Sequence, residues 1–282
     1  MNAFKIVGLV LSIAALSLTA CENFQKNIEV DLPNYESENV VECYLRPGRR
    51  ITLLLTKSSA YFGEVGIPQV PDAEVTIVAK GENSFVEPMR YRSNIPFVPG
   101  EYYNYESAQW VYPDDRSQYF LTVKDRRTGQ VITGTTEYLA PPYIDEVEAR
   151  FRESDSTAFL LTKFQDVDAY ERNYYRLVVK KRLAGGNDKI VNDIKFEGNL
   201  KTGNQITIGS SYDFKHGDEA TVTIYHLSKP YYEFLRTMDA AQQGNRNPFA
   251  QPTTVRSTVE GGLGVFTFLT YDERIVEVKF KK

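Results

Sequence analysis

The sequence of 282 residues is poor in the side chains from which metal sites are built. It has two cysteines and two histidines. His216 and His226 lie ten residues apart, and the chain has no H-x-x-x-H or C-x-x-C spacing. Two histidines alone do not complete a structural zinc site, which needs four ligands placed by the fold. We therefore predict no metal centre and no cofactor.

The motifs of nucleophilic catalysis and nucleotide binding are also missing. Residues 209–213, GSSYD, lack the G-x-S-x-G spacing of a nucleophile elbow and the helix that follows it. Residues 261–264, GGLG, lack the third glycine and the helix of a dinucleotide-binding loop, and we expect them at the tight start of a strand or at a bulge. The chain is predicted not to be an enzyme. A carboxylate-based glycan hydrolase is the open alternative, because acidic residues are plentiful.

The chain also lacks a basic excess. It has 33 lysines and arginines against 37 acidic residues, which gives a net charge of −4. Loss of residues 1–20 with Lys5 would leave −5. Nucleic-acid-binding proteins usually carry a basic surface, so we predict no nucleic-acid partner.

No run is long enough to cross a bilayer as a helix, which needs about 20 apolar residues. The longest uncharged run, residues 6–18, follows Lys5 and suits the apolar part of a signal peptide. It ends at Leu18-Thr19-Ala20-Cys21, which reads as a lipobox. We predict signal-peptide cleavage between Ala20 and Cys21, a lipid on Cys21 that anchors the protein to a membrane, and a polar tether over residues 21–38.

With Cys21 lipidated, Cys43 has no partner for a disulfide within the chain. Cys43 lies in the apolar run of residues 40–45. We expect it to be a small buried side chain in a strand, with a reactive thiol as the alternative.

Most of the remaining signal is that of β-strands, because apolar and polar residues alternate in short runs rich in β-branched and aromatic residues. Residues 119–124 and 131–135 predict a hairpin. Ala140-Pro141-Pro142 marks a boundary. We predict an all-β chain of two sandwich-like domains, residues 39–140 (immunoglobulin-like) and residues 143–282. Later strands are expected over residues 144–151, 158–164, 174–180, 190–196, 205–208, 220–227, 263–270 and 275–281.

One amphipathic helix is predicted near residues 229–243 of the second domain. Ser228 can cap it, and Gly244 suits the left-handed residue that ends a helix. An apolar stripe is expected to pack on the second sheet, with a cofactor or partner groove as the alternative. The stripe comprises Tyr231, Phe234, Leu235 and Met238.

A short acidic cluster falls in a turn between two predicted strands. It consists of Asp166, Asp168 and Glu171. Alternate carboxylates in a loop can bind calcium, but the spacing lacks the full calcium-loop pattern and its glycine. We expect a solvated turn in which the aspartates accept hydrogen bonds from backbone N–H groups.

An aromatic-rich stretch is the best candidate for ligand or partner contact. Exposed rings stack on sugars, peptides or other flat groups. The alternative is an edge loop whose rings cover the core. The stretch includes the only tryptophan and comprises Tyr102, Tyr103, Tyr105, Trp110 and Tyr112.

Several segments together resemble the domain-of-unknown-function 4249 family of Bacteroidetes lipoproteins. The most specific is GNRNPFAQPTTVRSTVEGGLGVF, residues 244–266, with further similarity at residues 40–62, 70–77, 119–136 and 173–179. The resemblance implies an outer-membrane lipoprotein, often encoded beside TonB-dependent receptors, and no established catalytic residues. The family's usual Asp-Pro after the first strand of the second half is replaced here by Asp166-Val167-Asp168.

We therefore expect a lipid-anchored, non-enzymatic binding or accessory module of the outer membrane. The expected partner is a TonB-dependent transporter, the ligand is unknown, and the periplasmic or surface side stays open. A surface adhesin or assembly component is a third possibility, for which a broad exposed apolar patch would be expected.

Overall fold

A computed structural model describes residues 36–59, 68–92, 102–153, 156–167, 172–198, 205–246 and 253–280. Within these residues the chain is mostly β-strand with one helix, which confirms the predicted all-β class. The predicted signal peptide, Ala20, Cys21 and nearly all of the tether lie outside the described residues. Everything below concerns the compact unit Ser37–Lys282.

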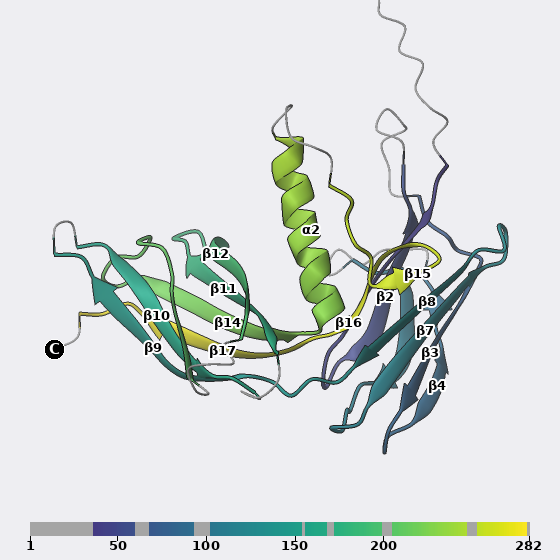
Figure 1. The fold of residues 1–282 in the computed structure, drawn as a ribbon, viewed down its shortest axis with the longest axis horizontal. Helices are drawn as coiled ribbons and strands as arrows, with labels where there is room; N and C mark the ends of the chain where they lie inside the picture. The colour runs from purple at the N-terminus through teal and green to yellow at the C-terminus, as the bar shows by residue number, and fades with distance from the viewer. Residues whose placement is uncertain are drawn as a thin grey trace, which may run out of the picture. The chain divides into compact units, whose positions relative to one another are not determined.

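The first sandwich consists of two five-stranded sheets with their apolar faces together (Figure 1). One sheet has the order β16-β1-β2-β6-β5 and the other β15-β8-β7-β3-β4. The strands of the first sheet are β1 (Asn39–Leu45), β2 (Arg50–Lys57), β5 (Arg90–Tyr91), β6 (Tyr105–Trp110) and β16 (Leu263–Phe268). Those of the second are β3 (Ala73–Lys80), β4 (Phe85–Pro88), β7 (Gln118–Asp125), β8 (Val131–Glu137) and β15 (Val259–Glu260).

Alternation of buried and solvent-facing residues builds this core. In β2, Ile51, Leu53 and Leu55 are buried, while Thr52 and Leu54 between them face outward. Cys43 lies in the core as predicted, and burial raises the pKa of its thiol, which keeps it protonated. The predicted hairpin is confirmed, because β7 and β8 pair in antiparallel register.

The first sandwich is completed by a segment from the far end of the chain. β16 pairs in parallel with β1, from Val40 opposite Leu263 to Leu45 opposite Phe268. Residues 263–270 were predicted to be a strand of the second domain, whereas this pairing places residues 263–268 in the first sandwich. Gly264 has a φ of +119° and lies so close to Val41 that a β-carbon would overlap the Val41 carbonyl. The expectation of a tight strand start at these glycines is confirmed.

The second sandwich has a three-stranded sheet, β13-β10-β9, and a four-stranded sheet, β12-β11-β14-β17. Their inner faces share an apolar core that includes Phe164, Tyr175 and Phe214. The strands are β9 (Tyr143–Phe151), β10 (Ala158–Gln165), β11 (Tyr174–Arg182), β12 (Asp188–Glu197), β13 (Gln205–Gly209), β14 (Glu219–Leu227) and β17 (Thr270–Glu277).

The single described helix, α2 (Lys229–Asn245), begins as predicted. The Ser228 hydroxyl accepts a hydrogen bond from the Tyr231 backbone N–H. The end differs from the prediction, because the helix runs through Gly244 and ends at Arg246, which has ordinary right-handed dihedral angles. A local backbone bond from Arg246 N–H to the Gln243 carbonyl closes the last turn, so no left-handed glycine is needed.

The apolar stripe of α2 packs on more than the second sheet. Tyr231 and Leu235 are buried against Leu227 of β14 and against Val265 and Leu269, which lie in or next to β16. The helix therefore covers the place where strands of the two sandwiches meet. Among the described residues, no helix combines the length and apolar character needed to cross a membrane.

Candidate functional site

An open pocket with a volume of about 480 Å³ lies on the outer face of the β16-β1-β2-β6-β5 sheet. We call it the arginine–aromatic pocket. Its size is within the range of small-molecule sites. It is lined by Glu42, Tyr44, Arg46, Arg49, Arg50, Thr52, Leu54, Tyr102, Tyr103, Glu106, Ser107 and Trp110.

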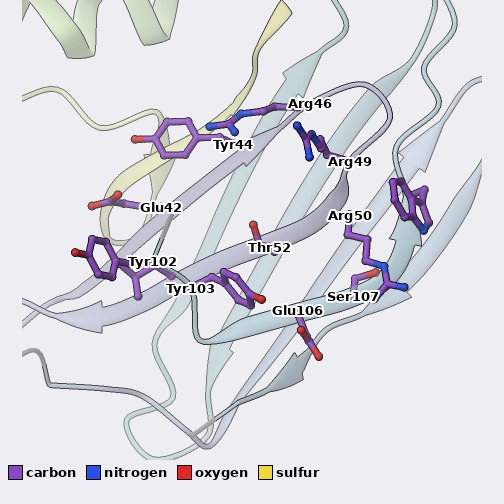
Figure 2. Close-up of a pocket in the computed structure, with 12 residues that line it drawn as sticks. Glu42, Tyr44, Arg46, Arg49, Arg50, Thr52, Tyr102, Tyr103, Glu106 and Ser107 are labelled. Atoms are coloured by element: carbon purple, nitrogen blue, oxygen red, sulfur yellow. The ribbon is translucent and has the colours of Figure 1, made fainter. Parts of the chain in front are cut away.

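The alternation of two neighbouring strands supplies the floor of this pocket. Glu42 and Tyr44 point outward from β1, and Thr52 and Leu54 point outward from β2, between the buried residues of the core. Figure 2 shows Arg49 and Arg50 at one end of the pocket and Glu42 and Tyr102 at the other. The pocket is therefore polar along its length, with opposite charges at its two ends.

A tight turn positions two of the arginines. Arg46-Pro47-Gly48-Arg49 joins β1 to β2, with a hydrogen bond of 3.3 Å from Arg49 N–H to the Arg46 carbonyl. Proline in the second position and Gly48 at a φ of +65° define a type II turn. Gly48 N–H donates to the Val111 carbonyl at 2.8 Å, and Val111 N–H donates to the Arg49 carbonyl at 3.0 Å, which holds the turn beside the end of β6.

An irregular pairing of β2 with β6 brings the tryptophan to the same end. Thr52 lies opposite Glu106, but Arg50 lies opposite Trp110, so β6 advances four residues while β2 advances two. Such bulges redirect side chains, often beside binding sites. The Arg50 guanidinium lies over the Trp110 ring, 5.7 Å from its centroid, and the pair forms a flat cationic surface.

The predicted aromatic stretch divides between surface and core. Tyr102, Tyr103 and Trp110 line the pocket, and Trp110 is 42% exposed. Tyr112 is exposed but is not among the lining residues. Tyr105 does not belong to this surface, because it is buried in the core and its hydroxyl donates to the Val70 carbonyl at 2.5 Å.

Some charged side chains in the pocket have an ion-pair partner and others do not have one among the described residues. Glu106 forms an ion pair of 2.5 Å with Arg92. Within the described residues, no carboxylate lies at ion-pair distance from Arg49 or Arg50. Crowding on the sheet face removes part of the hydration of Glu42 and raises the pKa of its carboxyl. The end with Arg49 and Arg50 is therefore positive in a chain whose net charge is negative.

A second pocket of about 330 Å³ adjoins the first and shares Tyr44 and Arg46 with it. We call it the junction pocket, because strands of both sandwiches and α2 line it. Arg176 there is held by two hydrogen bonds to Asp193, of 2.8 and 2.7 Å. Its other lining residues are Tyr225, Leu227, Tyr231, Leu269, Tyr271 and Glu273.

Most residues of this site were not predicted from the sequence. Its arginines and Tyr44 sit in ordinary strand and turn patterns, and only the fold brings them to one face. The RPGR turn was a usable signal, because Pro-Gly between two strand patterns predicts a hairpin whose ends carry the arginines.

The prediction of a solvated acidic turn is wrong at Asp166. Its carboxylate is buried and accepts hydrogen bonds from the Tyr175 hydroxyl at 2.6 Å and the Asn173 amide at 2.8 Å. A buried carboxylate needs such donors to offset lost hydration. Asp168 and Glu171 lie outside the described residues.

The two histidines do not meet. His226 is buried against Tyr175, and its Nδ1 lies 2.8 Å from the Ala140 carbonyl. Burial lowers the pKa of His226, which keeps it neutral. His216 stacks on Phe280 instead. Across the residues that the structure describes, no group of three or more His, Cys, Asp or Glu side chains could hold a metal ion.

A family model, described as a domain of unknown function (DUF4249), matches residues 25–275. The chain belongs to the DUF4249 family. The match covers both sandwiches, and the family description names no activity. It confirms the resemblance drawn from the sequence segments, including residues 244–266.

Other comparisons add little to the DUF4249 assignment. No curated protein matches the chain. A solved structure of a DUF4785 family protein from Legionella pneumophila matches at 11% identity and a TM-score of 0.26, over 66% of this chain and 52% of that one. The chain thus spans about half the length of that protein, and so weak a likeness carries no argument.

Proposed function

We propose that this protein is a non-enzymatic ligand-binding module held at the outer membrane by a lipid on Cys21. The observation that carries the proposal is the arginine–aromatic pocket, where exposed rings share one open sheet face with Arg49 and Arg50, neither of which pairs with a carboxylate among the described residues. A flat ligand that covers exposed aromatic rings removes their apolar surface from water, which favours binding. Guanidinium groups bind carboxylates or phosphates.

The only tryptophan of the chain lies in this pocket, so its fluorescence reports on the site directly. The test titrates the full chain, purified in detergent, with a panel of glycans and peptides. Saturable change in Trp110 emission with one panel member supports the proposal. A panel that leaves Trp110 emission unchanged and gives no binding heat counts against it.

A glycan hydrolase is the competing function, because two carboxylates line the same pocket and the pKa of Glu42 is raised as in a general acid. The arrangement favours binding. Glu106 is neutralised by Arg92, and Figure 2 shows the Glu42 and Glu106 carboxylates pointing away from one another. Incubation with any glycan that binds, followed by product analysis, tests this. Cleavage that the Glu42→Gln variant abolishes would establish the enzyme instead.

The membrane anchor and the partner are tested separately from the pocket. In a bacterial host, the wild-type chain should take up a fatty-acid label and sediment with membranes, whereas Cys21→Ala should do neither. The proposed partner is a TonB-dependent transporter, and it should co-purify with the tagged chain from detergent-solubilised outer membranes. Recovery without any outer-membrane protein would remove the accessory role and leave ligand binding standing.

A further inference from the structure

We propose that the ligand is an acidic oligosaccharide that lies along the arginine–aromatic pocket and continues into the junction pocket. This inference rests on the proposed function and names its ligand class. It is carried by three features, which are the placement of charge, the continuity of the two pockets and their position on a sheet face rather than at a sheet edge.

The charge favours an anionic group at one end of the ligand. Arg49 and Arg50 stand together beside Trp110, and no described carboxylate pairs with either of them. A carboxylate or sulfate on a sugar ring would accept hydrogen bonds from these guanidinium groups while the ring covers Trp110. The protein as a whole is acidic, so this attraction is local to the pocket.

The continuity of the two pockets favours a chain of several units over a small ion. Tyr44 and Arg46 line both pockets, which makes the arginine–aromatic pocket and the junction pocket neighbouring subsites. Beyond Tyr44 the lining is rich in tyrosine, with Tyr225, Tyr231 and Tyr271. Burial raises the pKa of Tyr44, Tyr225 and Tyr231, so their hydroxyls stay protonated and can exchange hydrogen bonds with sugar hydroxyls.

The position on the sheet face favours a glycan over a peptide. An extended peptide gains most from adding to a sheet edge, where backbone N–H and C=O groups are unpaired. β1 and β2 are interior strands of the order β16-β1-β2-β6-β5, so each already has a hydrogen-bonded strand on both sides. What the face offers is rings, hydroxyls and guanidinium groups, which suit sugar faces and acidic substituents.

The first experiment compares four probes on the full chain in detergent by calorimetry and Trp110 fluorescence. They are tetragalacturonate, a chondroitin sulfate tetrasaccharide, neutral cellotetraose and a tetraglutamate peptide. One of the two acidic glycans should bind at least about tenfold more tightly than cellotetraose, which corresponds to one charge-assisted contact. Its affinity should fall as salt is raised. Tetragalacturonate carries carboxylates alone, whereas chondroitin sulfate carries both carboxylates and sulfates, so comparing the two shows whether a sulfate group adds to binding.

Variants then locate the anionic group. Arg49→Ala and Arg50→Ala should each weaken the acidic glycan about tenfold, and Arg49→Lys should restore part of the loss. Arg127→Ala is the matched control, because Arg127 is an exposed arginine in the turn between β7 and β8 on the other sheet. It should leave binding unchanged.

Ligand length tests the second subsite. In the wild type, the tetrasaccharide should bind more tightly than the disaccharide. Tyr271→Ala should remove that gain while leaving disaccharide binding unchanged, with urea unfolding confirming that the variant is folded. Tyr271 suits this test because it is 46% exposed at the junction pocket.

The outcomes separate this inference from the proposed function. Equal binding of neutral and acidic glycans, tighter binding of tetraglutamate, or arginine variants that bind like the wild type would each overturn the acidic-oligosaccharide inference and leave a binding module in place. If none of these four probes binds, the acidic-oligosaccharide inference is also overturned. The wider panel of glycans and peptides described above then tests whether the protein binds any ligand.

Discussion

The two outer faces of the first sandwich are built by the same strand alternation and carry different chemistry. The outer face of β3, β7 and β8 is lined by threonines, with Thr76, Thr122 and Thr133 in one row across the three strands. We call it the threonine face. Its charges are partly paired, as in the ion pair of 2.7 Å between Glu74 and Arg126. The outer face of β1, β2 and β6 carries the arginine–aromatic pocket.

This difference indicates which of the two faces carries residues that stability alone does not explain. Threonine rows and exposed ion pairs suit a strand surface in water and contribute modestly to stability. The exposed rings beside Arg49 and Arg50, for which the described residues offer no carboxylate partner, are not explained by stability. Changes on the threonine face should therefore alter stability and leave binding intact, and changes in the pocket should act mainly on binding.

The largest expected effect tests whether β16 is required for the sheet that carries the pocket. Gly264→Val should lower the free energy of unfolding by at least about 3 kcal/mol, because a side chain there meets both a left-handed φ and the Val41 backbone. Urea unfolding measures it. Leu263→Ala, at a neighbouring half-exposed position, should change stability little. Equal losses in both variants would show that the backbone contact is not the cause.

Asp125 tests the sheet of the threonine face. Burial tends to raise its pKa, but hydrogen bonds from Thr128, Arg127 and Asn39 outweigh this and lower the pKa to about 2. Asp125→Ala should cost about 2–3 kcal/mol, because buried donors lose a charged acceptor, and it should leave ligand binding intact. A binding loss equal to that of a pocket variant would break the comparison.

The same residue gives a pH dependence with a defined sign. Its pKa in the folded state lies below the unfolded value of about 3.9, so its contribution is complete above about pH 4. The contribution is lost as the pH falls through about 2. The stability difference between wild type and Asp125→Ala, measured in urea at several pH values, should shrink over that range. A constant difference down to pH 2 would contradict the assignment.

Trp110→Ala tests the pocket itself. Binding of the best glycan should weaken about tenfold, because the ring and its contact with Arg50 are lost together. The free energy of unfolding should fall by about 1 kcal/mol without loss of the fold, since the side chain is 42% exposed and only partly covered. Calorimetry measures binding. Tyr112→Ala, outside the pocket, is the matched aromatic control. An equal loss of affinity in this variant would show that binding does not depend on the position of the ring in the pocket.

The smallest effect is expected on the threonine face. Thr122→Ala removes one hydroxyl from the threonine row and should change the free energy of unfolding by less than about 0.5 kcal/mol, with no change in binding. Chemical denaturation and calorimetry on the same preparation check both. A binding defect in this variant would show that the two faces are coupled and that the division drawn above is wrong.

Most strands were predictable because apolar and polar residues alternate within them. Strands β4, β5, β6 and β15 were not predicted, and β6 overlaps the aromatic stretch that was expected to contact a ligand or to form an edge loop. Strand β17 begins at Thr270, whereas residue 275 was expected. The hairpin of β7 and β8 and the start of α2 at Ser228 follow from local patterns. The partner of β16 was not predictable, because a pattern fixes which side of a strand is buried but not which distant strand it joins. The end of α2 was missed for a similar reason, since a local backbone bond closed the helix where a glycine was expected to do so.

The candidate site was predictable only in part. Clustered rings marked Tyr102, Tyr103 and Trp110, but the same pattern included the buried Tyr105. Arg46 and Arg49 come from one turn, Arg50 and Trp110 from two strands joined by a bulge. Their convergence depends on tertiary register, which leaves no local signal in the sequence.

The parallel pairing of β1 with β16 has a consequence for the order in which the protein is made. Strand β1 emerges from the ribosome long before its partner β16, which follows only after most of the second sandwich has been made. Until β16 arrives, one side of β1 stays without its strand partner. The first sandwich can therefore be completed only late, and a fragment ending at residue 140 would lack an edge strand in both of its sheets, β16 in one and β15 in the other.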